Sequence, residues 1–242
     1  MDRAVYARMG AAEAEHWWFR GRRAVLETLI ARNCALPANA RLLEAGCGTG
    51  GNLAMLARHG QLDAFEYDAD ARQEAASKGI VQIAAGALPD DVTAADGVYD
   101  LIALFDVLEH IEEDRASLMT LGTKLASKGH MLISVPAMPW LWSRHDEIHH
   151  HKRRYTKGSL RAVIAEAGLT VEAIGYFNTL LFPLAVAQRM VQRLTGHEAP
   201  ADAIPAPWLN SALGAIFRAE RHLVGRLPMP AGLSLYAIVT RN

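Results

Sequence analysis

The sequence has few cysteines, no long hydrophobic run and almost no net charge. Two cysteines, Cys34 and Cys47, cannot build a disulfide framework in a chain of 242 residues, so a reducing, cytoplasmic environment is predicted. No run of about 18 apolar residues could span a bilayer, and the N-terminal residues lack the apolar core of a signal peptide. The formal net charge of −1 is far from the basic excess that is typical of proteins that bind nucleic acid, so no nucleic-acid partner is predicted.

Short apolar runs alternate with amphipathic segments along most of the chain. We predict strands at residues 41–45, 62–66, 81–84, 100–105, 130–135, 171–176 and 233–239. Helices are predicted at residues 52–58, 69–78 and 113–126, and another begins after Thr156 and ends before Gly168. Alternation of this kind predicts an α/β fold, with a parallel sheet and helices on both of its faces.

Three segments are expected from this pattern. Residues 1–38 are predicted to form a helical lid, residues 39–178 with 231–242 a cofactor-binding sheet domain, and residues 179–230 a helical insertion before the last strand. The insertion carries a broad apolar face between Thr179 and Leu194, which needs a partner. That partner is the sheet domain, a second copy of the chain, or a lipid surface or lipid-linked acceptor. A homodimer and peripheral contact with a membrane therefore stay open as alternatives.

A glycine-rich turn follows the first predicted strand. The strand ends in Glu44, and glycines follow at alternate positions from Gly46 to Gly50. Glycine has no Cβ, so the backbone of such a turn can approach a ligand closely, and the next helix begins there. Glu66 ends the second strand, twenty residues after Gly46, and can accept hydrogen bonds from ribose hydroxyls. These features predict a nucleotide-like cofactor but do not separate NAD from S-adenosyl-L-methionine.

Four further segments carry a family resemblance. They are residues 16–23 with two tryptophans and three arginines, residues 99–111 with the string Asp106-Val107-Leu108-Glu109-His110, residues 131–136, and the helix start at Tyr155-Thr156. Together with the glycine turn they resemble the class I S-adenosylmethionine-dependent methyltransferases, of the small-molecule type 11 and type 12 kind. The resemblance covers about residues 13–178 and the last strand. It implies a Rossmann-like sheet of seven strands in the order 3-2-1-4-5-7-6, with S-adenosyl-L-methionine as cofactor.

The resemblance also implies a set of cofactor-binding residues. Arg22 is expected at the carboxylate of the cofactor or above the site, Asp106 at the methionyl pocket, and Tyr67 on the adenine. Many relatives have an aspartate where this chain has Ala87, so the backbone near Ala87 and Leu88 is expected to receive the adenine. The full predicted set is Arg22, Glu44, Gly46, Cys47, Gly48, Gly50, Asn52, Glu66, Tyr67, Ala87, Leu88 and Asp106.

The most unusual stretch is residues 140–155, which follows the fifth strand, where methyl acceptors are commonly bound in this fold. His145 and His149 have the i, i+4 spacing of one helix face, and a histidine there can take a proton from a hydroxyl acceptor. Arg154 and its neighbours can clamp a carboxylate or phosphate. A solvated, charged helix is the simpler alternative. We predict His145, His149 and Arg154 as catalytic residues and no metal site, because the segment has no HExxH pattern.

These patterns predict a methyltransferase that acts on a small molecule, through a hydroxyl or carboxylate oxygen. Transfer of a methyl group from S-adenosyl-L-methionine chiefly needs alignment and the exclusion of water. A hydroxyl acceptor needs a base, whereas a carboxylate needs a cation, and the chain offers both. An NAD-dependent oxidoreductase and a non-catalytic protein that binds a membrane or another partner stay as alternatives.

Overall fold

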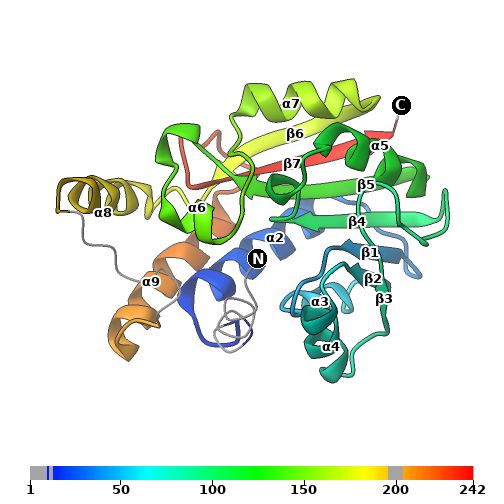
Figure 1. The fold of residues 1–242 in the computed structure, drawn as a ribbon, viewed down its shortest axis with the longest axis horizontal. Helices are drawn as coiled ribbons and strands as arrows, with labels where there is room; N and C mark the ends of the chain where they lie inside the picture. Colours follow the sequence, from blue (N-terminus) through cyan, green and yellow to red (C-terminus); the bar gives the residue numbers. More distant parts are fainter. Residues whose placement is uncertain (1–9, 11–12, 196–203, 242) are drawn as a thin grey trace.

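The computed structural model describes residue 10 and residues 13–195 and 204–241, and its centre is one seven-stranded sheet (Figure 1). The strands are β1 (Arg41–Ala45), β2 (Gln61–Glu66), β3 (Ile83–Ala85), β4 (Tyr99–Phe105), β5 (Leu125–Pro136), β6 (Leu169–Phe177) and β7 (Ser234–Arg241). Their spatial order is β3-β2-β1-β4-β5-β7-β6, which confirms the predicted order and fold class. Strands β1 to β5 pair in parallel, and β7 runs antiparallel between β5 and β6.

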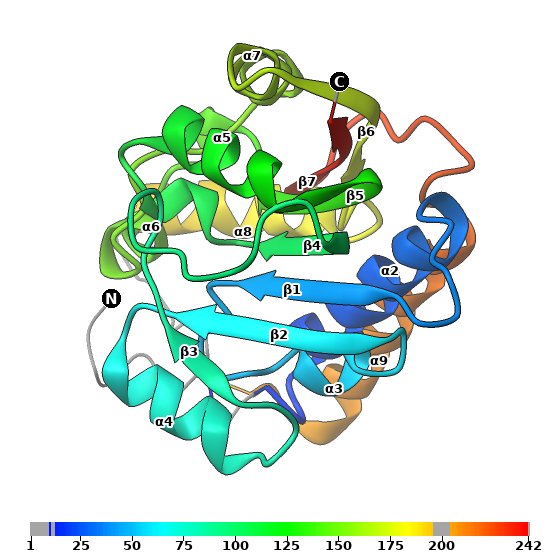
Figure 2. The same ribbon diagram turned by 90° about the vertical axis from the view of Figure 1, so that its right-hand side faces the viewer.

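Helices connect these strands and cover both faces of the sheet (Figure 2). They are α2 (Trp17–Asn33), α3 (Leu53–Leu56), α4 (Ala69–Ser77), α5 (Asp114–Lys124), α6 (Arg144–Ile148), α7 (Lys157–Glu166), α8 (Phe182–Thr195) and α9 (Pro207–Ala219), with short 3-10 turns η1 (Leu108–His110), η2 (Pro139–Leu141) and η3 (Glu220–His222). Thr156 caps α7, as predicted. The predicted helix over residues 113–126 ends earlier, at Lys124, because Leu125 is buried as the first residue of β5.

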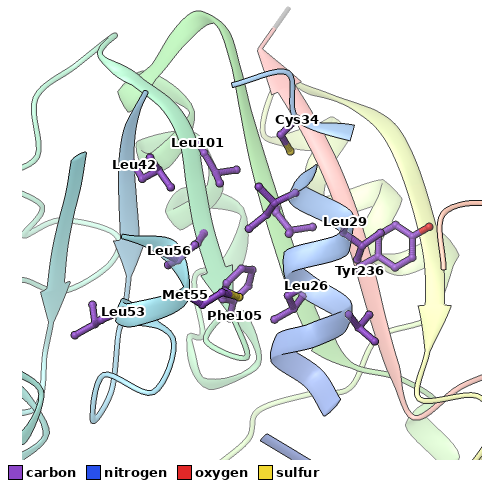
Figure 3. Close-up of a cluster of buried hydrophobic side chains, with 14 of the residues drawn as sticks. Leu26, Leu29, Cys34, Leu42, Leu53, Met55, Leu56, Leu101, Phe105 and Tyr236 are labelled. Carbon is purple, nitrogen blue, oxygen red and sulfur yellow. The ribbon is translucent and has the colours of Figure 1, made fainter. Parts of the chain in front are cut away.

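Alternate side chains of each central strand enter two separate hydrophobic cores. On β4, Leu101 and Phe105 belong to the core under α2 and α3, whereas Ile102 and Leu104 belong to the core under α5 and α7. Figure 3 shows the first of these cores, where α2 faces the strands. Burial on both faces explains why the central parallel strands read as continuous apolar runs in the sequence.

Helix α2 is a full member of the first core. Leu26 and Leu29 have no exposed surface, and both lie on the side of the helix that faces the sheet (Figure 3). The N-cap of α2 is His16, whose Nδ1 accepts a hydrogen bond from Trp18 N at 3.2 Å. These contacts anchor α2 to the sheet domain. A lid role for residues 1–38 stays a prediction. Residues 1–9 and 11–12 lie outside the described part of the chain.

The second half of the predicted insertion folds back onto α2. Helix α9 buries Phe217 completely, and a Cβ on Gly21 of α2 would lie only 2.3 Å from the Phe217 ring. Asn210 of α9 joins the two helices by hydrogen bonds, because its Oδ1 accepts from Trp17 N at 2.9 Å and its Nδ2 donates to Glu15 O at 2.9 Å. The close approach of α9 to α2 therefore depends on the glycine at position 21.

Helix α8, in contrast, projects from the sheet domain (Figure 1). Leu181, just before it, is buried, but Leu184, Met190 and Val191 are each more than half exposed. Within the described residues, the sheet domain thus leaves most of the apolar face of residues 179–194 uncovered, and the alternatives of a second copy and a lipid surface remain. In the part of the chain that is described, no helix is both long and apolar enough to cross a membrane.

Replacing Phe217 by alanine tests the contact between the insertion and α2. The substitution leaves a cavity beside Gly21, so the free energy of unfolding should fall by about 3–5 kcal/mol. Trp208→Ala on the same helix is the control, because Trp208 is 73% exposed and its loss should change stability by about 0.5 kcal/mol or less. Urea unfolding measures both. Equal effects of the two substitutions would show that α9 is not anchored through Phe217.

Candidate active site

The carboxyl ends of three central strands meet at one edge of the sheet. Strand β1 lies between β2 and β4, so the connections on its two sides run in opposite directions. Ligands of open α/β sheets bind at such a switch point. The glycine loop (residues 46–51) follows β1, Glu66 ends β2, and Asp106 follows β4. Three groups of predicted site residues are therefore brought together at this edge.

The three alternate glycines of this loop have different roles. All adopt positive φ, from 55° to 85°, which glycine tolerates without steric cost. A Cβ on Gly46 would lie 2.9 Å from Val107 Cγ2, and one on Gly50 would lie 2.8 Å from Leu53 Cδ1, so packing requires these two glycines. A Cβ on Gly48 would meet nothing within 4 Å. Gly48 therefore borders the open space in which a cofactor can contact the loop backbone.

Glu66 joins the glycine loop to the end of β2. Its carboxylate is buried and accepts hydrogen bonds from Gly48 N at 2.8 Å and from Asp68 N at 2.9 Å. A carboxylate has about four acceptor positions, so two backbone bonds leave capacity for two ribose hydroxyls. The next residue, Tyr67, is 78% exposed, and its ring is accessible for stacking on an adenine.

Arg22 reaches the same edge from α2. Its Nη2 lies 2.6 Å from Asp106 Oδ2, and its Nη1 donates to Asn52 Oδ1 at 3.4 Å. The guanidinium carbon lies 5.3 Å from the centroid of the Trp18 ring and 5.6 Å from that of Phe105, close enough for cation–π attraction to both. Asp106 itself has φ of +54°, a strained backbone conformation of the kind that clusters at functional sites.

Glu44 is a buried acid with acceptor capacity that the protein leaves unused. Asn52 Nδ2 donates to its Oε1 at 2.8 Å, but among the described residues its Oε2 has no hydrogen-bond donor. Burial raises the pKa of Glu44 to about 8, although the bond from Asn52 and the charge of Arg22 act in the opposite direction. An acid in this state can accept a hydrogen bond from the ammonium group of an amino-acid moiety.

The segment after β5 is organised by Asp146, which is completely buried. Its carboxylate closes a capping box with Ser143 at the start of α6. Arg154 donates to it from Nε at 2.7 Å and from Nη2 at 3.0 Å, and His151 Nδ1 lies 2.9 Å from it. Burial raises the pKa of Asp146, but hydrogen bonds from His151 and Arg154 outweigh burial and hold the pKa below its usual range. Arg154 also donates to Ala137 O at 3.1 Å, so its guanidinium is fixed.

The histidines of this segment cluster around that ion pair. The rings of His145 and His149 are 4.1 Å apart at their centroids, and His145 and His151 are 6.2 Å apart. Burial, followed by the charge of His149, lowers the pKa of His145 to about 3. His145 is therefore neutral at physiological pH and a weak base, although its ring can still accept or donate a hydrogen bond. The three predicted catalytic residues do lie in one cluster, and their catalytic roles stay predictions.

A family comparison decides what this site belongs to. Residues 18–174, more than half of the chain, match the model of a family described as a methyltransferase domain. The chain belongs to this methyltransferase family. The match spans the glycine loop and the ends of β2 and β4, and it confirms the predicted enzyme class with its cofactor S-adenosyl-L-methionine. No curated protein matches the sequence.

Solved structures share the fold of this methyltransferase. One is a chain of the complex between the Haloferax volcanii Trm112 methyltransferase activator and a methyltransferase, with 16% identity, a TM-score of 0.63, and coverage of 98% of this chain and 94% of that chain. Another is geranyl diphosphate C-methyltransferase from Streptomyces coelicolor A3(2), with 12% identity, a TM-score of 0.60, and coverage of 90% and 80%. A TehB-like methyltransferase from Corynebacterium glutamicum has 18% identity, a TM-score of 0.54, and coverage of 89% and 87%. At these identities the likeness establishes the fold.

The structure refines two of the predicted cofactor contacts, those of Ala87 and Cys47. Ala87 N donates to Asp91 O at 2.7 Å and Asp91 N donates back to Ala87 O at 2.8 Å, so the Ala87 amide is already paired and Leu88 is the better candidate for the adenine. Cys47 is 5% exposed, and burial raises the pKa of its thiol, which keeps it protonated. Its side chain therefore packs beside the loop, and its contact with the cofactor stays a prediction.

Glu13 is a site residue that sequence reasoning missed. Its buried carboxylate accepts from Thr49 Oγ1 at 2.6 Å and pairs with Lys78 Nζ at 2.9 Å, while Arg23 Nη2 donates to its carbonyl oxygen at 2.7 Å. Glu13 thus holds the glycine loop against α2 and α4. It lies outside any motif, and Thr49 is 36 residues away in the sequence, so no local signal could have found it.

Glu66→Gln tests the predicted ribose contact. The amide keeps the shape of the side chain but removes the charge and one acceptor, so the affinity for S-adenosyl-L-homocysteine should fall roughly 10- to 150-fold, the equivalent of about 1.5–3 kcal/mol. Glu166→Gln on the exposed side of α7 is the control and should bind as the wild type does. Isothermal titration measures both. Unchanged affinity in Glu66→Gln would remove Glu66 from the ribose site.

The raised pKa of Glu44 predicts a pH dependence of stability. The folded group keeps its proton up to about pH 8, whereas the unfolded group loses it near 4.5. Its contribution to stability is therefore complete below the unfolded pKa and is lost as pH rises through the folded pKa. Glu44→Gln carries a neutral amide at every pH and should not lose it. The unfolding free energy of Glu44→Gln should thus gain on that of the wild type by up to about 5 kcal/mol between about pH 4 and about pH 9.

Urea unfolding of the cofactor-free protein at both pH values measures this difference. Glu166→Gln serves again as the control, since an exposed carboxylate should show no comparable gain. A difference between Glu44→Gln and the wild type that does not change with pH would show that Glu44 is ionised in the folded protein.

Proposed function

We propose that this methyltransferase transfers the methyl group of S-adenosyl-L-methionine to a hydroxyl oxygen of a small-molecule acceptor. One observation carries the proposal: the ring of His145, which burial keeps neutral by lowering its pKa, lies in the segment after β5 beside the rings of His149 and His151. Glu109 of η1 lies between these histidines and the cofactor edge. Its buried carboxyl group interacts electrostatically with Asp106, Arg22 and Arg154.

The cofactor supplies a methyl group that is activated by its positive sulfonium. The residues of the chain bind and orient it: Glu66 accepts from the ribose, Gly48 offers open space, and Glu44 with Arg22 lies at the methionyl end. Trp18 and Phe105 enclose the guanidinium of Arg22 and exclude water from that end of the site. Alignment and dryness are the main contributions that a protein makes to such a displacement.

The structure supports a hydroxyl acceptor over a carboxylate. A carboxylate needs a free cation, but Arg154 is bound to Asp146 through two nitrogens and to Ala137 O through a third. The positive charge of Arg154 is therefore compensated by Asp146 and is not available to an acceptor carboxylate. A neutral imidazole such as that of His145 can instead accept a hydrogen bond from a hydroxyl and hold the oxygen in line. As the bond from oxygen to methyl forms, the bond from sulfur to methyl breaks and S-adenosyl-L-homocysteine leaves. The methylated oxygen is then acidic enough to release its proton through the ring to water.

The alternatives from the sequence differ in how much support they keep. An NAD-dependent oxidoreductase and a non-catalytic binding protein lose their basis, because the family match covers the cofactor loop. A lipid-linked acceptor, peripheral membrane contact and a homodimer remain proposals. The exposed Leu184 and Met190 on α8 support all three, since each would cover apolar side chains that otherwise face solvent.

A screen of methyl acceptors with isotopically labelled S-adenosyl-L-methionine tests the function. Label should appear on hydroxylated compounds and not on matched carboxylates. His145→Asn should lower kcat about tenfold or more with little change in cofactor affinity, because the acceptor is less well oriented. His150→Asn is the matched control, since His150 is exposed and has φ of +55°, which asparagine tolerates.

Three outcomes would contradict this proposal in different ways. Failure to bind S-adenosyl-L-methionine would overturn the function itself. Label on carboxylates would overturn the acceptor class, and equal turnover in the two histidine variants would remove His145 from the acceptor site.

A further inference from the structure

Three potential metal ligands meet beside the proposed acceptor site. Glu109 and His110 belong to η1 after β4, and His151 follows α6. One ligand atom from each of the three lies within 4.8 Å of the other two. We propose that Glu109, His110 and His151 form a binding site for a divalent zinc-like metal ion. The sequence predicts no metal site, whereas the structure brings these three potential ligands together.

Glu109 is a buried ligand with a carboxylate oxygen that a cation would pair. The residue is 1% exposed, and its Oε2 has no hydrogen-bond donor within the described part of the chain. Leaving such an oxygen unpaired in a low-dielectric interior is costly, and a bound cation would remove that cost. The neighbouring guanidinium groups do not fill this role, since Arg22 is paired with Asp106 and Arg154 with Asp146.

The ring of His151 is oriented by a carboxylate, as the rings of many zinc-binding histidines are. Its Nδ1 lies 2.9 Å from Asp146 Oδ1. Two hydrogen bonds from Arg154 stabilise the ionised form of that carboxylate. An ionised carboxylate only accepts hydrogen bonds, so Nδ1 is the donor in this contact and Nε2 is the ring nitrogen that can bind a metal ion. A carboxylate that orients a metal-bound imidazole in this way is a recurrent feature of zinc sites.

His110 meets the same requirement from the other segment. One nitrogen of its ring is hydrogen bonded to the backbone of His149, so the other nitrogen is available to a metal ion. The His110 and His151 rings lie 4.7 Å apart and nearly perpendicular, at 80°. Lys152 N donates to Glu109 O at 2.7 Å, so a backbone bond ties the two ligand-bearing segments together.

Two imidazoles and one carboxylate are the ligand set of several catalytic zinc sites, in which a fourth position stays open. Because Glu109 is only three residues from Asp106, an ion here would lie next to the methionyl end of the cofactor site. Its open position would bind and orient the hydroxyl oxygen of the acceptor. This role rests on the proposed function, but the binding of the ion does not.

Isothermal titration of the chelator-treated full chain with Zn²⁺ alone tests the site. The wild type should bind one ion per chain, and Glu109→Gln and His110→Asn should each weaken binding about tenfold or more. His150→Asn, an exposed histidine of the same segment, should bind as the wild type does. Thermal unfolding without metal checks folding. Glu109→Gln should be at least as stable as the wild type, because it removes a buried acid. Zn²⁺ should raise the unfolding temperature of the wild type and of His150→Asn more than that of Glu109→Gln or His110→Asn.

Binding of equal strength in the wild type and Glu109→Gln would overturn the site, and so would a loss of binding in His150→Asn as large as that in His110→Asn. Titration of the same samples with S-adenosyl-L-homocysteine separates the two proposals. If the cofactor product binds and Zn²⁺ does not, the metal site is wrong and the proposed function stands. If Zn²⁺ binds and the cofactor product does not, the proposed function is wrong and the metal site stands.

Discussion

The arrangement of the active site depends on the buried ion pair between Arg22 and Asp106. The Arg22 side chain is 6% exposed and its Nη2 lies 2.6 Å from the carboxylate. Removing Asp106 would leave the buried charge of Arg22 uncompensated, which is strongly destabilising. The pair therefore fixes α2 against the end of β4. Through Asn52, the same guanidinium is connected to Glu44 at the end of β1, so a helix, the glycine loop and two strand ends share one hydrogen-bonded chain.

The insertion contributes to this arrangement from a distance. Phe217 of α9 occupies the space that a side chain at position 21 would need, directly beside Arg22 in the sequence. The backbone of α2 can approach α9 only because that residue is glycine. Packing in the insertion thus helps to set the position of α2, and with it the direction in which Arg22 enters the cofactor site. This contact could not be predicted from the sequence, since Gly21 lies within a helix among arginines and Phe217 is far from it along the chain.

Most of the fold, and the edge of the sheet at which the predicted cofactor-binding residues meet, could be predicted because their signals are local. Glu44, Glu66 and Asp106 each stand at or just after the end of an apolar run, and a parallel sheet brings such ends to one edge without further information. The glycine loop likewise carries its geometry in its composition, although only the structure separates Gly48, which borders open space, from Gly46 and Gly50, which packing requires. The end of α5 was misplaced because Leu125 and Ala126 suit a helix as well as a strand.

The contacts around the proposed acceptor site could not be predicted, because they join residues that are distant in sequence. Arg154 looks like an anion clamp until the fold pairs it with Asp146. His145 and His149 suggested a site on one helix face, but the structure gathers Glu109 and His110 with His151, which is 41 residues after His110. These segments meet because β4 and β5 are neighbours in the sheet and each ends at the same edge. The chemistry of that edge is consequently set by strand order, and no spacing within either segment could have revealed it.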